Sequence, residues 1–261
     1  IKFRKTCEEY KNSIWLAERN GEEWRTIKYG ESLSIVDRIA QSMVDSDLNQ
    51  DKGVMILSGN SINHGLINLA AMSAGIPLSP ISVAYSLMSR DFAKLKHCFD
   101  LVLPGMIYIE DGCQFEEALS CLNLEGVEIV CSKNQSKKIK MKLFDDLLLI
   151  RPKDILQSVY ESVNHQFVAK YLFTSGSTGM PKGVINTQLM LCTNMQQVQQ
   201  IRPYEMNENN IVVDWLPWNH TMGGNHIFNG VFWSGGSLYI DKGRPIPGMF
   251  NETIRNLKEI F

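Results

Sequence analysis

The sequence predicts an α/β protein with parallel-rich sheets flanked by helices. Two observations carry this prediction. Apolar segments of strand length alternate with helical segments along the chain, which is typical of a parallel sheet covered by helices. In addition, a glycine-rich loop directly follows an apolar strand at residues 168–173. The 261 residues are 44% hydrophobic and 21% charged, which is ordinary for a globular protein with a substantial core.

The elements follow from the apolar periodicity and the turn residues. Helices are expected at residues 31–44, 62–74, 90–99, 115–122, 188–200 and 252–261. Strands are expected at residues 53–57, 101–103, 106–109, 127–131, 168–173, 211–216 and 237–240, with a further extended segment at 75–78. The lysine-rich residues 133–142 lack the aromatic side chains on which bases stack, so we interpret them as a solvated loop. They allow a subdomain junction near residues 133–167.

Charge and cysteine content narrow the class of protein. A net charge of −2 gives no field that would attract nucleic acid or an anionic membrane. No apolar run reaches the ~20 residues that span a bilayer, and the first residues lack the apolar part of a secretory signal. The six cysteines form no C-x-x-C pair and do not cluster with histidine, which disfavours a metal site and a disulfide framework. A cytoplasmic protein with reduced thiols is expected.

The most informative segment is the loop at residues 171–183, which reads YLFTSGSTGMPKG. Its last ten residues hold three glycines, four hydroxyl side chains and one lysine. Glycines let the backbone approach an anion closely, backbone N–H groups and hydroxyls donate to phosphate oxygens, and lysine adds positive charge. The loop therefore predicts a polyphosphate site. Its predicted nucleotide-binding residues are Thr174, Ser175, Gly176, Ser177, Thr178, Gly179 and Lys182.

Other glycine-rich motifs fit this loop poorly. A Walker A loop requires G-x-x-x-x-G-K followed by Ser or Thr, whereas Pro181 precedes Lys182 here and Gly183 follows it. The G-x-S-x-G elbow of serine hydrolases is also missing from the segment. A plain surface turn is the remaining alternative, and thirteen residues in this order after a strand disfavour it.

The loop resembles the phosphate-binding signature of the adenylate-forming enzymes, a strand followed by (S/T)-S-G-(S/T)-T-G-x-P-K-G. Residues 29–33 and 69–80 resemble two weaker motifs of that superfamily, in the same order. Residues 213–226 resemble its P-x-x-H-x-x-G motif, with His220 at the histidine position. The sequence around His220 is most similar to that of feruloyl-CoA synthase, as is the sequence of residues 236–241.

The resemblance implies an acid–thiol ligase of the acyl-CoA synthetase type. Its substrates would be ATP with Mg²⁺, a small-molecule carboxylic acid and coenzyme A. Lys182 and His220 would be the catalytic residues, and His220, Met222 and His226 would line the acyl side of the site. No residue is assigned as a metal ligand. Trp215, Trp218 and Met222 would either supply apolar surface for an aryl or alkenyl acid or belong to an ordinary core.

The resemblance also implies parts that we do not find before Phe261: an adenine motif, a ribose-binding aspartate, a hinge and a C-terminal lysine. Residues 1–261 are therefore interpreted as a partial N-terminal adenylation domain without its C-terminal domain, expected to be inactive alone. Three alternatives stay open: a phosphate-releasing nucleotide hydrolase or transferase, a catalytically silent nucleotide-binding fragment, and an adenylating enzyme with a non-CoA acceptor. The oligomeric state is not predicted.

Overall fold

The computed structural model describes residues 2–174, 179–244 and 246–261. The chain divides into two compact units, and each is described by itself. The first unit comprises Ile1–Ser34, Asn60–Ile62 and Cys192–Phe261. The second comprises Ile35–Gly59 and Asn63–Leu191. Residues 133–167 fall inside the second unit, and the subdomain junction expected there stays a prediction.

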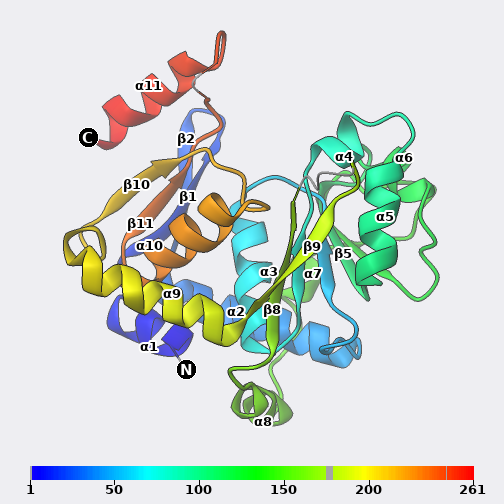
Figure 1. Cartoon of the computed structure of the whole chain (residues 1–261), viewed down its shortest axis with the longest axis horizontal. Coiled ribbons are helices and arrows are strands. Elements are labelled where there is room, and N and C mark those ends of the chain that lie inside the picture. Colours follow the sequence, from blue (N-terminus) through cyan, green and yellow to red (C-terminus); the bar gives the residue numbers. More distant parts are fainter. Residues whose placement is uncertain (1, 175–178, 245) are drawn as a thin grey trace. The chain divides into compact units, whose positions relative to one another are not determined.

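The second unit is built on a seven-stranded sheet in the order β7-β6-β5-β3-β4-β8-β9 (Figure 1). All neighbouring pairs are parallel except β8 and β9, which form an antiparallel pair at one edge. The strands are β3 (Val54–Ile56), β4 (Leu78–Pro80), β5 (Met106–Asp111), β6 (Glu128–Lys133), β7 (Lys142–Leu143), β8 (Val168–Thr174) and β9 (Lys182–Thr187).

Side chains alternate between the two faces of this sheet, as the pleat requires. Ile107 and Ile109 of β5 pack in one apolar cluster with residues of α5 (Ala93–Val102) and α6 (Glu116–Ser120), which lie on the same side of β5 in Figure 1. Tyr108, between them, stacks edge-on against Phe144 of α7 (Phe144–Leu147) on the other face. Helices therefore cover both faces of the sheet.

The first unit contains a four-stranded sheet in the order β10-β11-β1-β2. Strands β10 (Ile211–Asp214), β11 (Ser237–Ile240) and β1 (Ile14–Asn20) are parallel, and β2 (Glu23–Lys28) is antiparallel to β1. An aromatic core fills this unit: Trp15 of β1 contacts the rings of Tyr29, Phe228 and Phe232. Large aromatic rings of this kind bury much apolar area per side chain and stabilise such a core.

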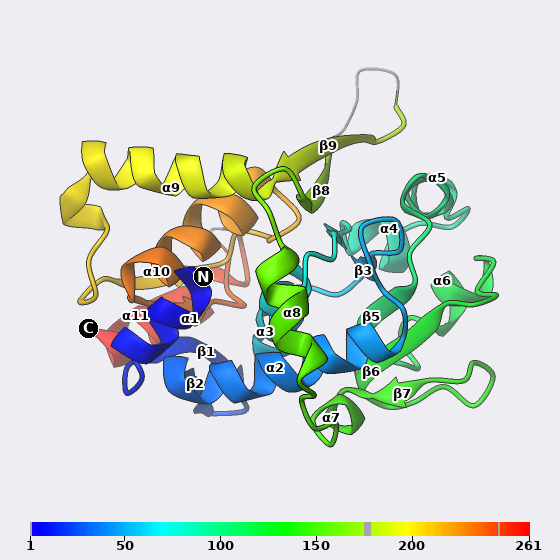
Figure 2. The same ribbon diagram turned by 90° about the horizontal axis from the view of Figure 1, so that it is seen from below.

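The remaining helices complete the two units, as Figures 1 and 2 show. They are α1 (Lys2–Glu9), α2 (Tyr29–Asp45), α3 (Ile62–Ser73), α4 (Ala84–Leu87), α8 (Ile155–Ser162), α9 (Gln188–Ile201), a 3₁₀ turn (Pro203–Glu205), a π-helical segment (Met222–Ile227), α10 (Phe228–Ser234) and α11 (Phe250–Ile260).

The architecture confirms the predicted fold class, and most predicted elements are present to within a few residues. The strand expected at residues 101–103 is wrong, because α5 continues to Val102. Leu103 ends that helix with φ of 46°, and the following Pro104 disfavours a further helical residue before it. Strands β1, β2, β7 and β9 were not predicted.

Among the described residues, no helix is both long enough and apolar enough to cross a membrane. Cys7, Cys98 and Cys131 are buried, as packed thiols are expected to be, whereas Cys113 and Cys192 are exposed.

Candidate active site

The β8–β9 hairpin carries the described part of the predicted phosphate loop. Its register places Thr174, the last residue of β8, opposite Lys182, the first residue of β9. Leu172 and Phe173 are buried and hold β8 in the sheet, while Thr174 and Lys182 are exposed at the open end of the hairpin. The Thr174 hydroxyl lies 3.5 Å from the Lys182 carbonyl oxygen, to which it donates. A hydroxyl and an ammonium group therefore leave the sheet from adjacent positions.

The four loop residues Ser175, Gly176, Ser177 and Thr178 lie outside the described residues. Gly179 returns the chain toward β9 with φ of 87°, in the left-handed region that L-residues with a side chain rarely adopt. Glycine at this position is therefore required by the backbone conformation.

His97 of α5 anchors the stem of the hairpin. Its Nε2 lies 2.9 Å from the carbonyl oxygen of Pro181, so Nε2–H must be the donor. This bond fixes the residue directly before Lys182. The sequence analysis missed it, because His97 is 84 positions away and occurs in no motif.

The second predicted segment begins in the first unit, at the carboxyl end of β10. Ligands of open α/β sheets bind at this end of the strands. Asp214, the last residue of β10, accepts a hydrogen bond from the Leu216 N–H through Oδ1 at 3.1 Å. The pKa of Asp214 is raised to about 6, mainly by burial; the backbone N–H groups of Leu216 and Trp215 oppose the shift, and the nearby Asp241 carboxylate adds a smaller upward contribution.

Two glycines let the π-helical segment pack directly against the preceding loop. A Cβ on Gly224 would lie 2.1 Å from the Trp218 carbonyl oxygen, and one on Gly223 would lie 2.7 Å from the Leu216 carbonyl oxygen. Both distances are far too short for any side chain. The motif glycines are therefore required by close backbone packing, and π-helical turns often occur at functional sites.

The predicted acyl-side residues differ in exposure. His220 and Met222 are exposed, and His226 is half-buried. Trp218 is only 2% exposed, and its ring centroid lies 4.6 Å from that of Phe228. Trp218 therefore belongs to the core of the unit rather than to a substrate surface, which decides between the two interpretations that the sequence left open for it.

The predicted residues fall into two groups, one in each unit. Thr174, Gly179 and Lys182 belong to the second unit, and His220, Met222 and His226 belong to the first. The first group lies at the open end of the β8–β9 hairpin, and the second lies in or just before the π-helical segment.

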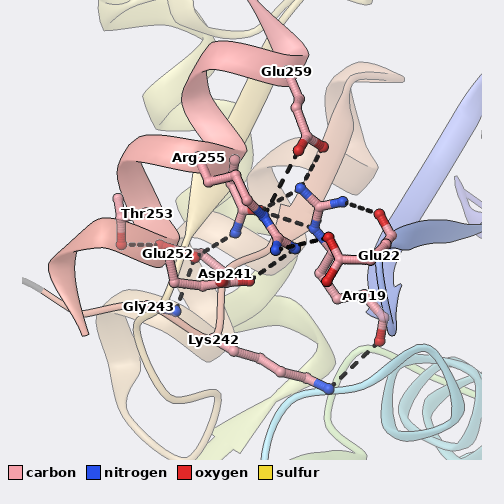
Figure 3. A network of polar contacts seen from close by, with 10 residues as sticks. Arg19, Glu22, Asp241, Lys242, Gly243, Glu252, Thr253, Arg255 and Glu259 are labelled. Atoms are coloured by element: carbon pink, nitrogen blue, oxygen red, sulfur yellow. Dashed lines mark hydrogen bonds and ion pairs between the residues drawn. The ribbon is translucent and has the colours of Figure 1, made fainter. Parts of the chain in front are cut away.

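Next to β10, the carboxyl end of β11 is held by the polar network shown in Figure 3. Asp241 accepts hydrogen bonds from the Gly243 N–H at 2.9 Å, the Asn256 amide at 2.7 Å and the Thr253 hydroxyl at 2.6 Å. Arg19 of β1 donates to Asn256 Oδ1 from Nε at 2.9 Å and pairs with Glu259. The network attaches α11 to this end of the sheet, and no sequence motif indicated it.

The described residues contain no group of three or more His, Cys, Asp and Glu side chains that would hold a metal ion. In nucleotide enzymes Mg²⁺ is usually bound through the substrate phosphates with only one or two carboxylates. The exposed Thr174 hydroxyl is the kind of oxygen donor that such an ion accepts.

Comparison with known proteins identifies the family. The AMP-binding enzyme family matches residues 3–258, so the chain belongs to that family of adenylate-forming ligases. The chain is 24% identical over 191 residues to the long-chain-fatty-acid–CoA ligase ACSBG2 of Homo sapiens, covering 70% of this chain and 28% of that protein. It is 27% identical over 192 residues to the oxalate–CoA ligase of Arabidopsis thaliana, covering 72% of this chain and 35% of that ligase.

The fold is also that of a solved structure with bound ATP. ATP-bound MatB from Rhodopseudomonas palustris superimposes with a TM-score of 0.71 at 17% identity, covering 99% of this chain and 47% of MatB. The chain thus spans about a third of the two curated relatives and less than half of MatB.

Proposed function

We propose that the chain is the N-terminal part of an ATP-dependent acid–thiol ligase. In the first half-reaction, a carboxylate oxygen of the acid attacks the α-phosphorus of ATP, and the bond to the β-phosphate breaks to release pyrophosphate. In the second, the thiolate of coenzyme A attacks the acyl carbonyl carbon, and AMP leaves. The observation that carries the proposal is the family match over residues 3–258, which includes the whole Thr174–Lys182 hairpin.

The main physical problem of the first step is charge, because an anionic carboxylate must approach an anionic polyphosphate. Fixed positive charge and oriented donors are the usual solution. Lys182 and Thr174 leave adjacent positions at the end of a paired hairpin whose β8 strand is anchored by the buried Leu172 and Phe173, so their backbones are in place before the nucleotide binds. In the proposal, the ammonium group of Lys182 and the loop N–H groups and hydroxyls hold the β- and γ-phosphates and the departing pyrophosphate.

His220 is proposed to place the carboxylate of the acid. It is exposed directly before the π-helical segment, at the carboxyl end of the parallel strands of its unit. Met222, which is 56% exposed, and the half-buried His226 lie on the same turn and would face the acyl group. Mg²⁺ supplies charge neutralisation when it is bound with ATP.

The acid is proposed to be aromatic or unsaturated, such as a hydroxycinnamate. The support is the likeness of the His220 motif to feruloyl-CoA synthase, together with the half-buried Trp215 and the exposed Met222. Trp218 gives no support, because it is a core residue. The two relatives named above act by name on long-chain fatty acids and on oxalate, so both acids belong in the test.

Carboxylate-dependent exchange of labelled pyrophosphate into ATP tests the proposal in the natural full-length protein. We expect exchange that requires an acid, then thioester formation when coenzyme A is added. Ferulate, coumarate, acetate, oxalate and hexadecanoate form the panel, and fastest exchange with ferulate or coumarate supports the hydroxycinnamate proposal. Fastest exchange with another acid overturns that finer proposal and leaves the ligase standing.

The competing functions give different products. A nucleotide hydrolase releases orthophosphate without any acid. A catalytically silent domain binds ATP without exchange, and an enzyme with a non-CoA acceptor shows exchange but forms no CoA thioester. Each of these results would overturn the acid–thiol ligase.

A further inference from the structure

The loop that carries His220 makes few backbone hydrogen bonds of its own. His220 N–H donates to the Pro217 carbonyl at 3.1 Å, and Gly224 N–H donates to the His220 carbonyl at 2.8 Å. The strand pairing of β10 ends at Asp214, six residues before His220. The residues between them therefore need partners from side chains.

Asn60 supplies two of those partners. Its Nδ2 donates to the Leu216 carbonyl at 2.8 Å, and its Oδ1 accepts from the Trp218 N–H at 2.9 Å. One planar carboxamide thus bonds the carbonyl and the N–H of two residues that flank Pro217, as a neighbouring strand would. The Leu216 N–H donates to the Asp214 carboxylate, and proline has no N–H. Asn60 and Asp214 together therefore bond every backbone N–H of residues 216–218 and the Leu216 carbonyl.

Asn60 is itself held in the same unit. Two residues further on, the N–H of Ile62 donates to Oε2 of Glu18 on β1 at 3.0 Å. Residues 60–62 are therefore tied to the sheet as well as to the loop. Gly223 also packs against this loop, because its backbone lies so near the Leu216 carbonyl that no side chain fits between them.

We propose that Asn60 is a positioning residue for His220: its carboxamide fixes the backbone of residues 216–218 and, through it, the point from which the imidazole of His220 reaches the acyl substrate. Asn60 does not touch the reacting atoms. The proposal rests on the proposed function, since it assigns His220 to the carboxylate. Without the carboxamide, the loop keeps its sequence and its glycine packing but loses the two bonds that define its path.

The first test needs no activity. Hydrogen–deuterium exchange is compared between the wild type, Asn60→Ala and Asn60→Asp in the natural full-length protein. We expect Asn60→Ala to speed uptake in the peptide that covers residues 215–226 by about tenfold or more, because the Trp218 N–H loses its acceptor. Asn60→Asp retains that acceptor and loses only the donor to Leu216, so its uptake should be intermediate. Asn209→Ala, an exposed asparagine in the same unit, is the matched control and should leave the peptide unchanged.

The second test is a double-mutant cycle on acid-dependent pyrophosphate exchange. A misplacement of about 1 Å in a positioned group can cost up to ~10²-fold, so we expect Asn60→Ala to lower kcat about tenfold in the wild-type background. In the His220→Ala background it should cause no further loss, since its effect passes through the imidazole. A merely structural role would give the same loss in both backgrounds.

The outcomes separate the two proposals. Unchanged deuterium uptake in Asn60→Ala, or equal losses in both backgrounds, overturns the role of Asn60. If the wild type shows no exchange with any acid, the proposed function fails, and the uptake experiment alone then decides whether Asn60 fixes the loop. If Asn60→Ala does not fold, Asn60→Asp carries both comparisons, with the same expected direction and a smaller size.

Discussion

The β8–β9 hairpin and the His220 segment both carry motif glycines, but the glycines serve different ends. In the hairpin, a Cβ on Gly183 would meet the nearest ring atom of Phe173 at 3.6 Å, an ordinary contact. In the His220 segment, a Cβ on Gly224 would lie 2.1 Å from a backbone oxygen. The hairpin end is exposed and open, whereas the His220 segment is packed against its own loop. The backbone packing therefore excludes a side chain at Gly224, whereas the space beside Gly183 admits one.

Lys182→Ala tests this contrast with the largest expected effect. Loss of one preorganised charge contact to a transition state costs about 10²–10³ in rate, so acid-dependent pyrophosphate exchange should fall by that factor in the full-length protein. Because Lys182 is exposed, thermal unfolding should be unchanged. Arginine at the same position is the control that keeps the charge. Undiminished exchange in Lys182→Ala would remove Lys182 from the chemistry.

Gly224→Ala tests the other side of the contrast. The added methyl group has no room beside the Trp218 carbonyl, and the loop must shift, so we expect a loss of about 3 kcal/mol in the free energy of unfolding. Gly183→Ala is the matched control, and its effect should stay within about 0.5 kcal/mol. Urea denaturation of both variants measures the difference. Equal free energies of unfolding for the two variants would mean that backbone packing does not restrict Gly224 more than Gly183.

Lys170 of β8, a residue of the hairpin itself, is fully buried, and burial lowers the pKa of its ammonium group to about 7. The unfolded chain binds this proton up to about pH 10.4, so the folded state binds fewer protons than the unfolded state above pH 7. Stability should therefore rise between pH 7 and pH 8.5, by up to about 1.4 kcal/mol per pH unit.

Lys170→Met should remove this rise, and urea denaturation at several pH values measures it. Lys182→Met, at the exposed end of the same hairpin, should keep the wild-type slope. If Lys170→Met and the wild type have equal slopes, the buried ammonium group is not the cause.

Asp214 gives a smaller effect of the opposite sign in the His220 segment. Its pKa is raised to about 6, so the folded state holds a proton that the unfolded chain releases near pH 3.9. This contribution to stability is fully present below about pH 4 and is lost as pH rises to 6, at no more than about 1.4 kcal/mol per pH unit.

His64, whose pKa burial lowers to about 4, acts in the opposite direction over the same range. The informative measurement is therefore the change in the free energy of unfolding between pH 4 and pH 6, compared between Asp214→Asn and the wild type. Asp214→Asn should lose less stability than the wild type over this range. A variant that loses as much stability as the wild type over this range would contradict the assignment.

The fold followed from the sequence wherever an element has its own periodicity. Helices α2 and α3 and strands β5 and β8 were predicted within a few residues, because each has several buried apolar positions. Strand β9 was missed because it is mostly exposed and begins with Lys182 and Gly183, residues that are typical of a loop. Strand β1 pairs with β11, and no local pattern indicates a pairing more than two hundred residues apart.

The candidate site likewise contains residues that a local motif indicates and residues that only long-range contacts indicate. Lys182 and His220 were found because each occurs in a contiguous motif. Asn60 was not identified as a site residue, since its partners Leu216 and Trp218 lie 156 and 158 positions away. Contacts of this kind are decided by tertiary structure, and a single sequence does not record them.

The network around Asp241 has a consequence for the evolution of the family. Asp241 has three donors, and Asn256, which is fully buried, bonds both this carboxylate and the guanidinium of Arg19. A change at one of these three positions leaves a buried charge or amide without its bond, which costs more than the bond itself contributes. Homologues should therefore retain all three residues or replace them together, so that positions 19, 241 and 256 covary although 237 residues separate the first from the last.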